Sequence, residues 1–158
     1  MYAKPPSASA VDHNVYKIFP NDLNSKNTVF GGLVMSLCDR AALIVAERHS
    51  GHACVTAALD SLEFLAAART GDTLLIQSAV NRAWRSSMEI GVRVTAENSR
   101  TGRSRHIVSA YLTFVALDED GKPTAVPAVA PETEAEQKRF EAAEMRREQR
   151  MKMREAHR

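Results

Sequence analysis

The chain has 158 residues, of which 44% are hydrophobic and 25% charged, and its formal net charge is +2. These values are typical of one globular domain with an appendage, and so small a charge does not by itself indicate a nucleic-acid partner. No apolar run approaches the roughly 20 residues that span a bilayer, and residues 1–7 lack the apolar core of a signal peptide. We therefore expect no membrane association. Two cysteines, Cys38 and Cys54, make no disulfide framework, so we expect buried thiols and a cytoplasmic location.

The predicted elements follow a Pro- and Ser-rich N-terminus, residues 1–12, which we expect to be flexible. Residues 13–19 alternate as a first strand, which a Pro-Asn-Asp turn ends. A long helix then begins after the turn at residues 27–32, carries one broad apolar stripe and ends near Gly51. Four strand-like runs come next, with short turns that imply antiparallel pairing, over residues 54–65, 73–81, 87–96 and 105–117.

This order of elements predicts the fold class. One long helix ahead of an antiparallel meander can bury its apolar stripe only by lying across the sheet, so we expect an α+β domain over residues 13–125. One such layer leaves a helix side and a sheet edge exposed, which predicts a homo-oligomer, a dimer as the minimum.

Residues 126–158 are predicted to form a charged helical C-terminal tail, with its acids mostly before Met145 and its bases after it. That charge run is either a solvated face or a basic end that contacts phosphates, on a ligand or on nucleic acid. The scarcity of aromatic residues and the mixed charge argue against nucleic acid.

Asp39 is the most informative residue of the predicted helix. The residues three and four positions away carry no charge; they are Met35, Ser36, Ala42 and Leu43. A solvent-facing helix position usually has charged neighbours at that spacing, so Asp39 is predicted to be half-buried without a counter-ion. Such a carboxylate can act as a general base. An Asp at a water-exposed edge of the helix, or one that accepts a hydrogen bond from a distant backbone amide, would give the same sequence pattern.

The turn before the helix offers backbone donors. Asn27 can adopt a left-handed conformation, and the pair Gly31 and Gly32 allows a close approach to a ligand. Amides at a helix start favour an anion, either a phosphate or the oxyanion of an acyl transfer. Tight packing of the helix on the sheet would also explain the two glycines.

Taken together, these residues resemble the acyl-CoA thioesterases (acyl-CoA hydrolases) of the hotdog fold, in the bacterial form with a single hotdog domain. The resemblance covers residues 12 to 150 and is carried by residues 24–32, Met35, Asp39, Arg48-His49, 55–57, Asp60, Phe64, Gly71-Asp72, 86–89, 113–118, 121–123 and 131–134. It implies an antiparallel sheet wrapped around a central helix, hydrolysis of acyl-CoA to CoA and a carboxylic acid, no metal and no cofactor. It also implies an active site shared across a dimer, and a trimer of dimers.

The resemblance assigns roles to individual residues. Asp39 would be the general base, or a nucleophile; the Gly31 amide would hold the oxyanion, and Asn24 would position water or the carbonyl from the facing subunit. Substrate-binding candidates are Asn27, Gly32, Thr56, Phe64, Arg85, Ser86 and Ser87. Thr56 and Phe64 would line the acyl channel, although Phe64 is equally compatible with the core.

Several alternatives stay open at this point. Arg82, Arg85, Arg103 and Arg105 suit CoA phosphates but also suit exposed strand ends. His49 at the helix end is expected to be structural. Residues 65–68 lack a proline that relatives often have, which leaves the acyl chain length undetermined. The alternative functions are a non-catalytic acyl-CoA-binding module and a hotdog hydratase or dehydratase; the latter needs a His–carboxylate pair that this helix lacks.

Overall fold

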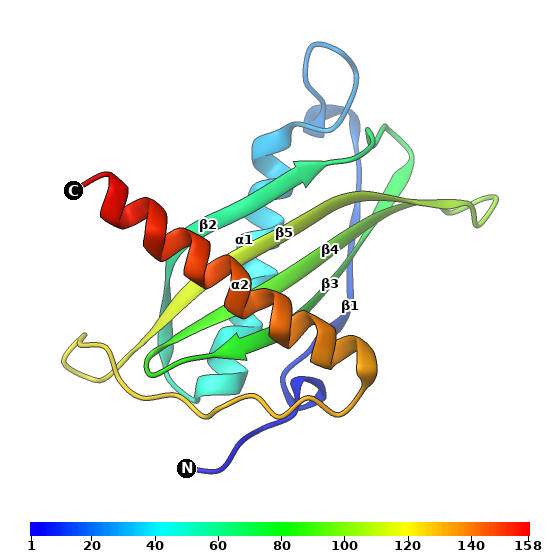
Figure 1. Ribbon diagram of the computed structural model, residues 1–158. Helices are drawn as coiled ribbons and strands as arrows, with labels where there is room; N and C mark the ends of the chain where they lie inside the picture. Colours follow the sequence, from blue (N-terminus) through cyan, green and yellow to red (C-terminus); the bar gives the residue numbers. More distant parts are fainter.

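The computed structural model describes all residues, 1–158, and shows a five-stranded antiparallel sheet with one long helix on each face (Figure 1). The elements are β1 (Val11–Lys17), α1 (Gly31–Ser50), β2 (Ala53–Phe64), β3 (Asp72–Ala83), β4 (Ser87–Asn98), β5 (Ser104–Leu117) and α2 (Glu134–Ala156), with 3-10 turns at Pro6–Ala8 and Pro20–Asp22. The predicted α+β fold, with its central helix and helical tail, is confirmed. Neither long helix is apolar enough to cross a membrane.

The strand order β1-β3-β4-β5-β2 places β2 at one edge of the sheet. β2 follows α1 in the chain but pairs antiparallel with β5, so its other edge has no partner strand within the chain. Figure 1 shows β2 passing across α1, and Thr56 of β2 lies within hydrogen-bond distance of Asp39 of α1. An unpaired edge of this length is a template for pairing with another chain.

The core lies between α1 and the inner face of the sheet. Every third or fourth residue of α1 is fully buried, and small side chains such as Ala41 and Ala42 let the helix approach closely. The strands alternate, so that residues such as Leu74, Ile90 and Phe114 meet the helix while their neighbours face outward. Gly51 ends the helix at φ 75°, as predicted.

The C-terminal helix packs on the outer face of the sheet, whereas the sequence left open whether this helix packs (Figure 1). Arg146 forms two hydrogen bonds with the fully buried Glu89, at 2.6 and 3.0 Å. One turn later, Arg150 lies 3.1 Å from Asp60 of β2. The outward-facing carboxylates of the sheet therefore take two arginines of the tail as partners, because residues four apart share one helix face.

The N-terminal residues, expected to be flexible, make specific contacts. Lys4 pairs with Val129 in a parallel bridge, and its ammonium group donates to the carbonyls of Arg48 and His49 at 2.8 and 3.1 Å. These carbonyls belong to the last turn of α1, where orphan acceptors and the helix dipole favour a cation. Composition alone does not indicate such a contact, because its partners are more than 40 positions away along the chain.

Candidate active site

Asp39 lies in the middle of α1, and its carboxylate faces β2. The Thr56 hydroxyl donates a hydrogen bond to Asp39 Oδ1 at 2.7 Å. None of the five ion pairs of the chain includes Asp39, so the half-buried carboxylate has no cationic partner within the chain. Burial and the nearby charge of Asp39 raise the pKa of the Cys38 thiol to about 12. Cys38 is therefore not the group at this point of the helix that could act as an acid or base near neutral pH.

Asp60, which lies in β2 like Thr56, is a carboxylate with a structural role and can be compared with Asp39. It accepts a hydrogen bond of 2.6 Å from the Thr113 hydroxyl and lies 3.1 Å from Arg150. A cation and a hydroxyl thus already occupy the carboxylate of Asp60. Asp39 has the hydroxyl of Thr56 and no cation, which leaves its second oxygen free for a ligand.

The turn before α1 is built around Asn24. Its side-chain oxygen accepts from the backbone amides of Lys26 and Thr28, at 2.9 and 3.3 Å, and its amide group donates to the Thr28 hydroxyl at 3.0 Å. Asn27 has φ 60°, so the predicted left-handed conformation is confirmed. Asn24 thus shapes the turn, and its side chain stays exposed at the surface.

The N-terminus of α1 opens into a pocket. Phe30 is the N-cap residue and provides no side-chain cap, so the amides of Gly31 and Gly32 have no intrahelical acceptor. The pocket has a volume of about 440 Å³ and is mostly apolar; it is lined by Asn24, Thr28, Val29, Gly31, Phe64, Leu65, Ala66, Ala67, Ala68 and Ile107. The Gly31 amide, at the start of α1, therefore borders a largely apolar hollow, an arrangement that suits an oxyanion with a hydrocarbon substituent.

Phe64 forms the rim of this pocket and is not part of the core. Its ring is 50% exposed, and it lies 3.4 Å from the position that a Cβ atom on Gly31 would occupy. A Cβ atom at position 31 would be in ordinary van der Waals contact with the ring, so Phe64 packs directly beside the start of α1. Of the two interpretations of Phe64, the structure supports the pocket lining.

Two groups of predicted site residues lie apart within one chain. Gly31 and Asp39 are eight residues apart on α1, which corresponds to ~12 Å along the helix axis. One carbonyl cannot contact both of them at once, because each contact requires about 3 Å. A single chain thus holds Asp39 with Thr56 at one place, and Gly31 with Asn24 at another.

The predicted CoA contacts lie at the Asp39 end. Ser87 pairs with Val115, which pairs in turn with Val55 next to Thr56, so Ser87 lies two strands from β2, ~10 Å away. Ser86 belongs to the turn between β3 and β4, and Arg85 beside it is exposed and forms no ion pair. This turn presents free polar groups to solvent.

Two of the four arginines considered for CoA phosphates have partners within the chain. Arg82 lies 3.2 Å from Glu144 and 4.0 Å from the centre of the Phe140 ring, so it holds α2. Arg105 donates to the Ala67 carbonyl and to Asp72. For these two arginines the structural interpretation applies.

His49 is structural, as expected. It is fully buried, and its Nε2 lies 2.7 Å from the Pro127 carbonyl, which can only accept, so Nε2 carries the proton. Burial lowers the pKa of His49, and the Lys4 ammonium adds to this effect. It lies ten residues from Asp39 on α1, ~15 Å along the helix, too far to act with that carboxylate.

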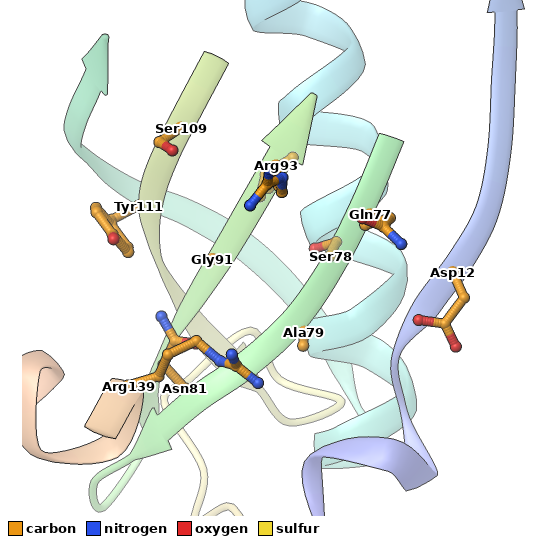
Figure 2. Close-up of a pocket in the computed structure, with 11 residues that line it drawn as sticks. Asp12, Gln77, Ser78, Ala79, Asn81, Gly91, Arg93, Ser109, Tyr111 and Arg139 are labelled. Carbon is orange, nitrogen blue, oxygen red and sulfur yellow. The ribbon is translucent and has the colours of Figure 1, made fainter. Parts of the chain in front are cut away.

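A second hollow lies on the opposite face of the sheet, beside α2 (Figure 2). It measures about 310 Å³ and is lined by Asp12, Gln77, Ser78, Ala79, Asn81, Gly91, Val92, Arg93, Ser109, Tyr111 and Arg139. The buried side chain of Asn81 has its Oδ1 without a hydrogen-bond partner. No predicted site residue lies in it, and its residues come from five separate elements, so no local motif indicates it.

Comparison with known proteins places the chain in a family. The model of the thioesterase superfamily matches residues 26–103. The acyl-CoA thioester hydrolase YkhA of Bacillus subtilis, itself uncharacterized, is 45% identical over 120 residues, which cover 76% of this chain and 70% of that protein. The chain therefore belongs to the acyl-CoA thioester hydrolases of the thioesterase superfamily, and the enzyme class predicted from the sequence is confirmed.

Solved structures agree with this assignment and with the hotdog fold. An apo-hexameric acyl-CoA thioesterase superposes with a TM-score of 0.93 at 38% identity, covering 97% of both chains. An acyl-CoA hydrolase of Staphylococcus aureus, in complex with butyryl-CoA, CoA and CoA disulfide, gives a TM-score of 0.90 at 38% identity and covers 96% and 92% of the two chains. Structures of that enzyme are also known with an aspartate, a threonine or an asparagine replaced by alanine.

Proposed function

We propose that this chain hydrolyses acyl-CoA thioesters to free CoA and a carboxylic acid, with Asp39 as the general base. The observation that carries the proposal is the Asp39 carboxylate itself, half-buried, without a cation and held by the Thr56 hydroxyl at 2.7 Å. Thr56 fixes one carboxylate oxygen, which leaves the other directed at the substrate. The proposal requires no cofactor other than the CoA of the substrate.

The reaction follows from these groups. The free oxygen of Asp39 takes a proton from a water molecule, whose oxygen attacks the thioester carbon. Negative charge moves to the carbonyl oxygen, where the Gly31 amide donates a hydrogen bond and the Gly32 amide adds a second donor at the positive end of α1. Collapse of the intermediate breaks the carbon–sulfur bond, and the proton held by Asp39 neutralises the leaving thiolate of CoA. Asp39 acting directly as a nucleophile is the second possibility for this step.

The spacing of the residues supports this assignment. In the Staphylococcus aureus enzyme, the aspartate replaced by alanine lies fifteen positions after the replaced asparagine, and the threonine lies thirty-two positions after it. Asn24, Asp39 and Thr56 have the same spacing here. In the proposal, Asn24 and the left-handed Asn27 shape the turn that presents the water or the carbonyl, and Thr56 orients the base.

The site is proposed to form between two copies of the chain. Because Gly31 and Asp39 lie ~12 Å apart in one copy, the oxyanion donors of one subunit must face the base of the other. The free edge of β2 and the apolar surface around it supply the interface; its exposed residues are Phe30, Met35, Ile44, Val55, Leu59 and Phe64. Hexameric relatives make a trimer of such dimers the expected assembly.

The contacts with the CoA phosphates and with the acyl chain are assigned to side chains that are at least partly exposed in the single chain. Arg85 has no ion pair, and with Ser86 and Ser87 it forms a polar turn that we assign to the phosphates of CoA. Phe64 lines the entrance of the acyl pocket.

No observation favours the hydratase, since no histidine forms a hydrogen bond with Asp39. A non-catalytic module would leave the unpaired carboxylate without a role.

The test is the variant Asp39→Asn, which keeps the shape of the side chain and removes the base. We expect CoA release to fall by about 10²–10⁴-fold, the usual contribution of a general base, while the oligomer stays intact by size-exclusion chromatography. CoA release from acetyl- to palmitoyl-CoA is followed with a thiol reagent. Near-normal turnover by the variant would refute the assignment of Asp39, and no turnover by the wild type, from folded protein that still binds CoA, would favour the non-catalytic module.

A further inference from the structure

The acyl pocket has one wall made of consecutive small residues. Ala66, Ala67 and Ala68 follow the end of β2, and all three line the pocket at the N-terminus of α1. Each alanine presents only a methyl group, so the depth of the hollow depends on where the backbone of this segment lies. In a close-packed protein, one or two added methylenes in such a wall change which ligands fit.

The wall is held by hydrogen bonds at each of its ends. The Leu65 amide donates to the Ile107 carbonyl of β5 at 2.8 Å. The Ala68 carbonyl accepts from the Val29 amide, also at 2.8 Å, one residue before the N-cap of α1. The segment therefore bridges the sheet and the helix start that carries the oxyanion donors.

Arg105 holds the middle of the wall. Its Nε and Nη2 atoms both donate to the Ala67 carbonyl, at 3.0 and 2.6 Å, and Nη2 also lies 2.8 Å from Asp72 Oδ2. Asp72 is itself nearly buried and accepts from the Arg69 amide at 3.0 Å. A planar guanidinium in this geometry fixes both the position and the direction of the carbonyl, which a single donor would not do.

We propose that Ala66–Ala68 determine the acyl chain length that this enzyme accepts, and that Arg105 is the positioning residue that holds this wall in place. The inference rests on the proposed thioesterase function and extends it to the specificity of the acyl pocket. It assigns Arg105 to the acyl end of the substrate, whereas its charge alone would also suit the CoA phosphates. The two assignments predict different kinetics.

The positioning role is tested with Arg105→Gln, which shortens the side chain and removes the pair of N–H donors that hold the Ala67 carbonyl. We expect kcat/KM for octanoyl-CoA, relative to acetyl-CoA, to fall at least threefold, mainly through KM, because only the longer chain reaches the wall. Inhibition by free CoA should not change. Arg100→Gln is the matched control, since Arg100 is exposed in the same hairpin and its side chain makes no contact with the wall.

The specificity role is tested with Ala66→Leu, which narrows the pocket. Leucine adds three carbons to the side chain, and the octanoyl-to-acetyl ratio should fall by at least about tenfold, because a single methylene in a hydrophobic pocket already contributes that much. Ala135→Leu, an equal change at an exposed position of α2, is the control for added apolar surface. Thermal unfolding of each variant checks the fold, and Arg105→Lys replaces Arg105→Gln if the latter does not fold.

Two results would overturn the inference. An unchanged octanoyl-to-acetyl ratio in both Arg105→Gln and Ala66→Leu would show that the wall does not select the chain. A uniform rise of KM for all acyl-CoAs, together with weaker inhibition by free CoA, would place Arg105 at the phosphates. Both require an active wild type, so absence of any wild-type turnover refutes the proposed function itself.

Discussion

The contact between α2 and the sheet predicts a large loss of stability for Arg146→Met. Glu89 is fully buried, and Arg146 provides two of its hydrogen bonds, at 2.6 and 3.0 Å. The third comes from the Asn81 amide at 2.9 Å. Methionine keeps most of the length of the arginine stem but removes the charge, so the variant leaves a buried carboxylate with one neutral donor.

The magnitude follows from burial. Removing one partner of a buried ion pair costs about 3–5 kcal/mol, because the remaining charge is uncompensated. The Arg146 side chain is 23% exposed, so water can reach part of the vacated space and the lower end applies, about 3 kcal/mol. For a chain of this size that corresponds to a melting temperature lower by about 6–12 °C. The guanidinium also lies 3.7 Å from the centre of the Tyr111 ring, and loss of that contact acts in the same direction.

The assay is urea unfolding followed by circular dichroism at one fixed protein concentration, since association contributes to stability. Lys138→Met is the matched control, because Lys138 pairs with Glu134 at 3.4 Å with both side chains largely exposed, and such a pair contributes at most about 0.5 kcal/mol. Replacing both partners, Glu89→Leu with Arg146→Met, should recover most of the loss. If Arg146→Met destabilises no more than Lys138→Met, the argument that α2 is held by a buried ion pair is refuted.

Two further predictions follow from shifted pKa values. The pKa of His49 is lowered by burial, so between the folded pKa and the unfolded value of about 6.5 the unfolded chain binds more protons. The free energy of unfolding is therefore not reduced by His49 above about pH 6.5, and it decreases as the pH falls below that value. His49→Gln keeps a donor for the Pro127 carbonyl and should flatten this pH dependence in melting curves. Burial also raises the pKa values of Cys38, to about 12, and of Cys54, so a thiol reagent at pH 8 should modify both only after unfolding in urea. Rapid modification of the native chain would contradict this.

Much of the fold was predictable because it depends on local periodicity. Alternation predicts strands at residues 73–81 and 87–96, and their ends lie within two residues of those of β3 and β4. The apolar stripe likewise predicts the long helix. The docking of α2 was not predictable, since it depends on pairs such as Glu89 and Arg146, which are 57 positions apart. The contact of Lys4 with the end of α1 has the same long-range character.

The candidate site was predictable in part. Asp39 stood out because its helical neighbours carry no charge, and the left-handed Asn27 followed from the turn pattern. Periodicity could not give the hydrogen bond from Thr56, because it depends on where β2 crosses α1. Nor could it separate the roles of Arg85 and Arg105, which differ only in whether a carbonyl and a carboxylate lie within reach.

The position of Asp39 relative to Gly31 connects the fold to the need for a second subunit. A helix fixes the distance between its residues, so Gly31 and Asp39, the oxyanion donor and base of the proposed mechanism, stay ~12 Å apart along the axis within one chain. The same helix has an apolar surface that the five-stranded sheet leaves uncovered, next to the free edge of β2. In the proposed dimer, pairing two copies through that edge would bury this surface and bring Asp39 of one copy toward Gly31 of the other. One interface would then meet both requirements of the proposed mechanism, which accounts for a carboxylate without a cation at the middle of α1.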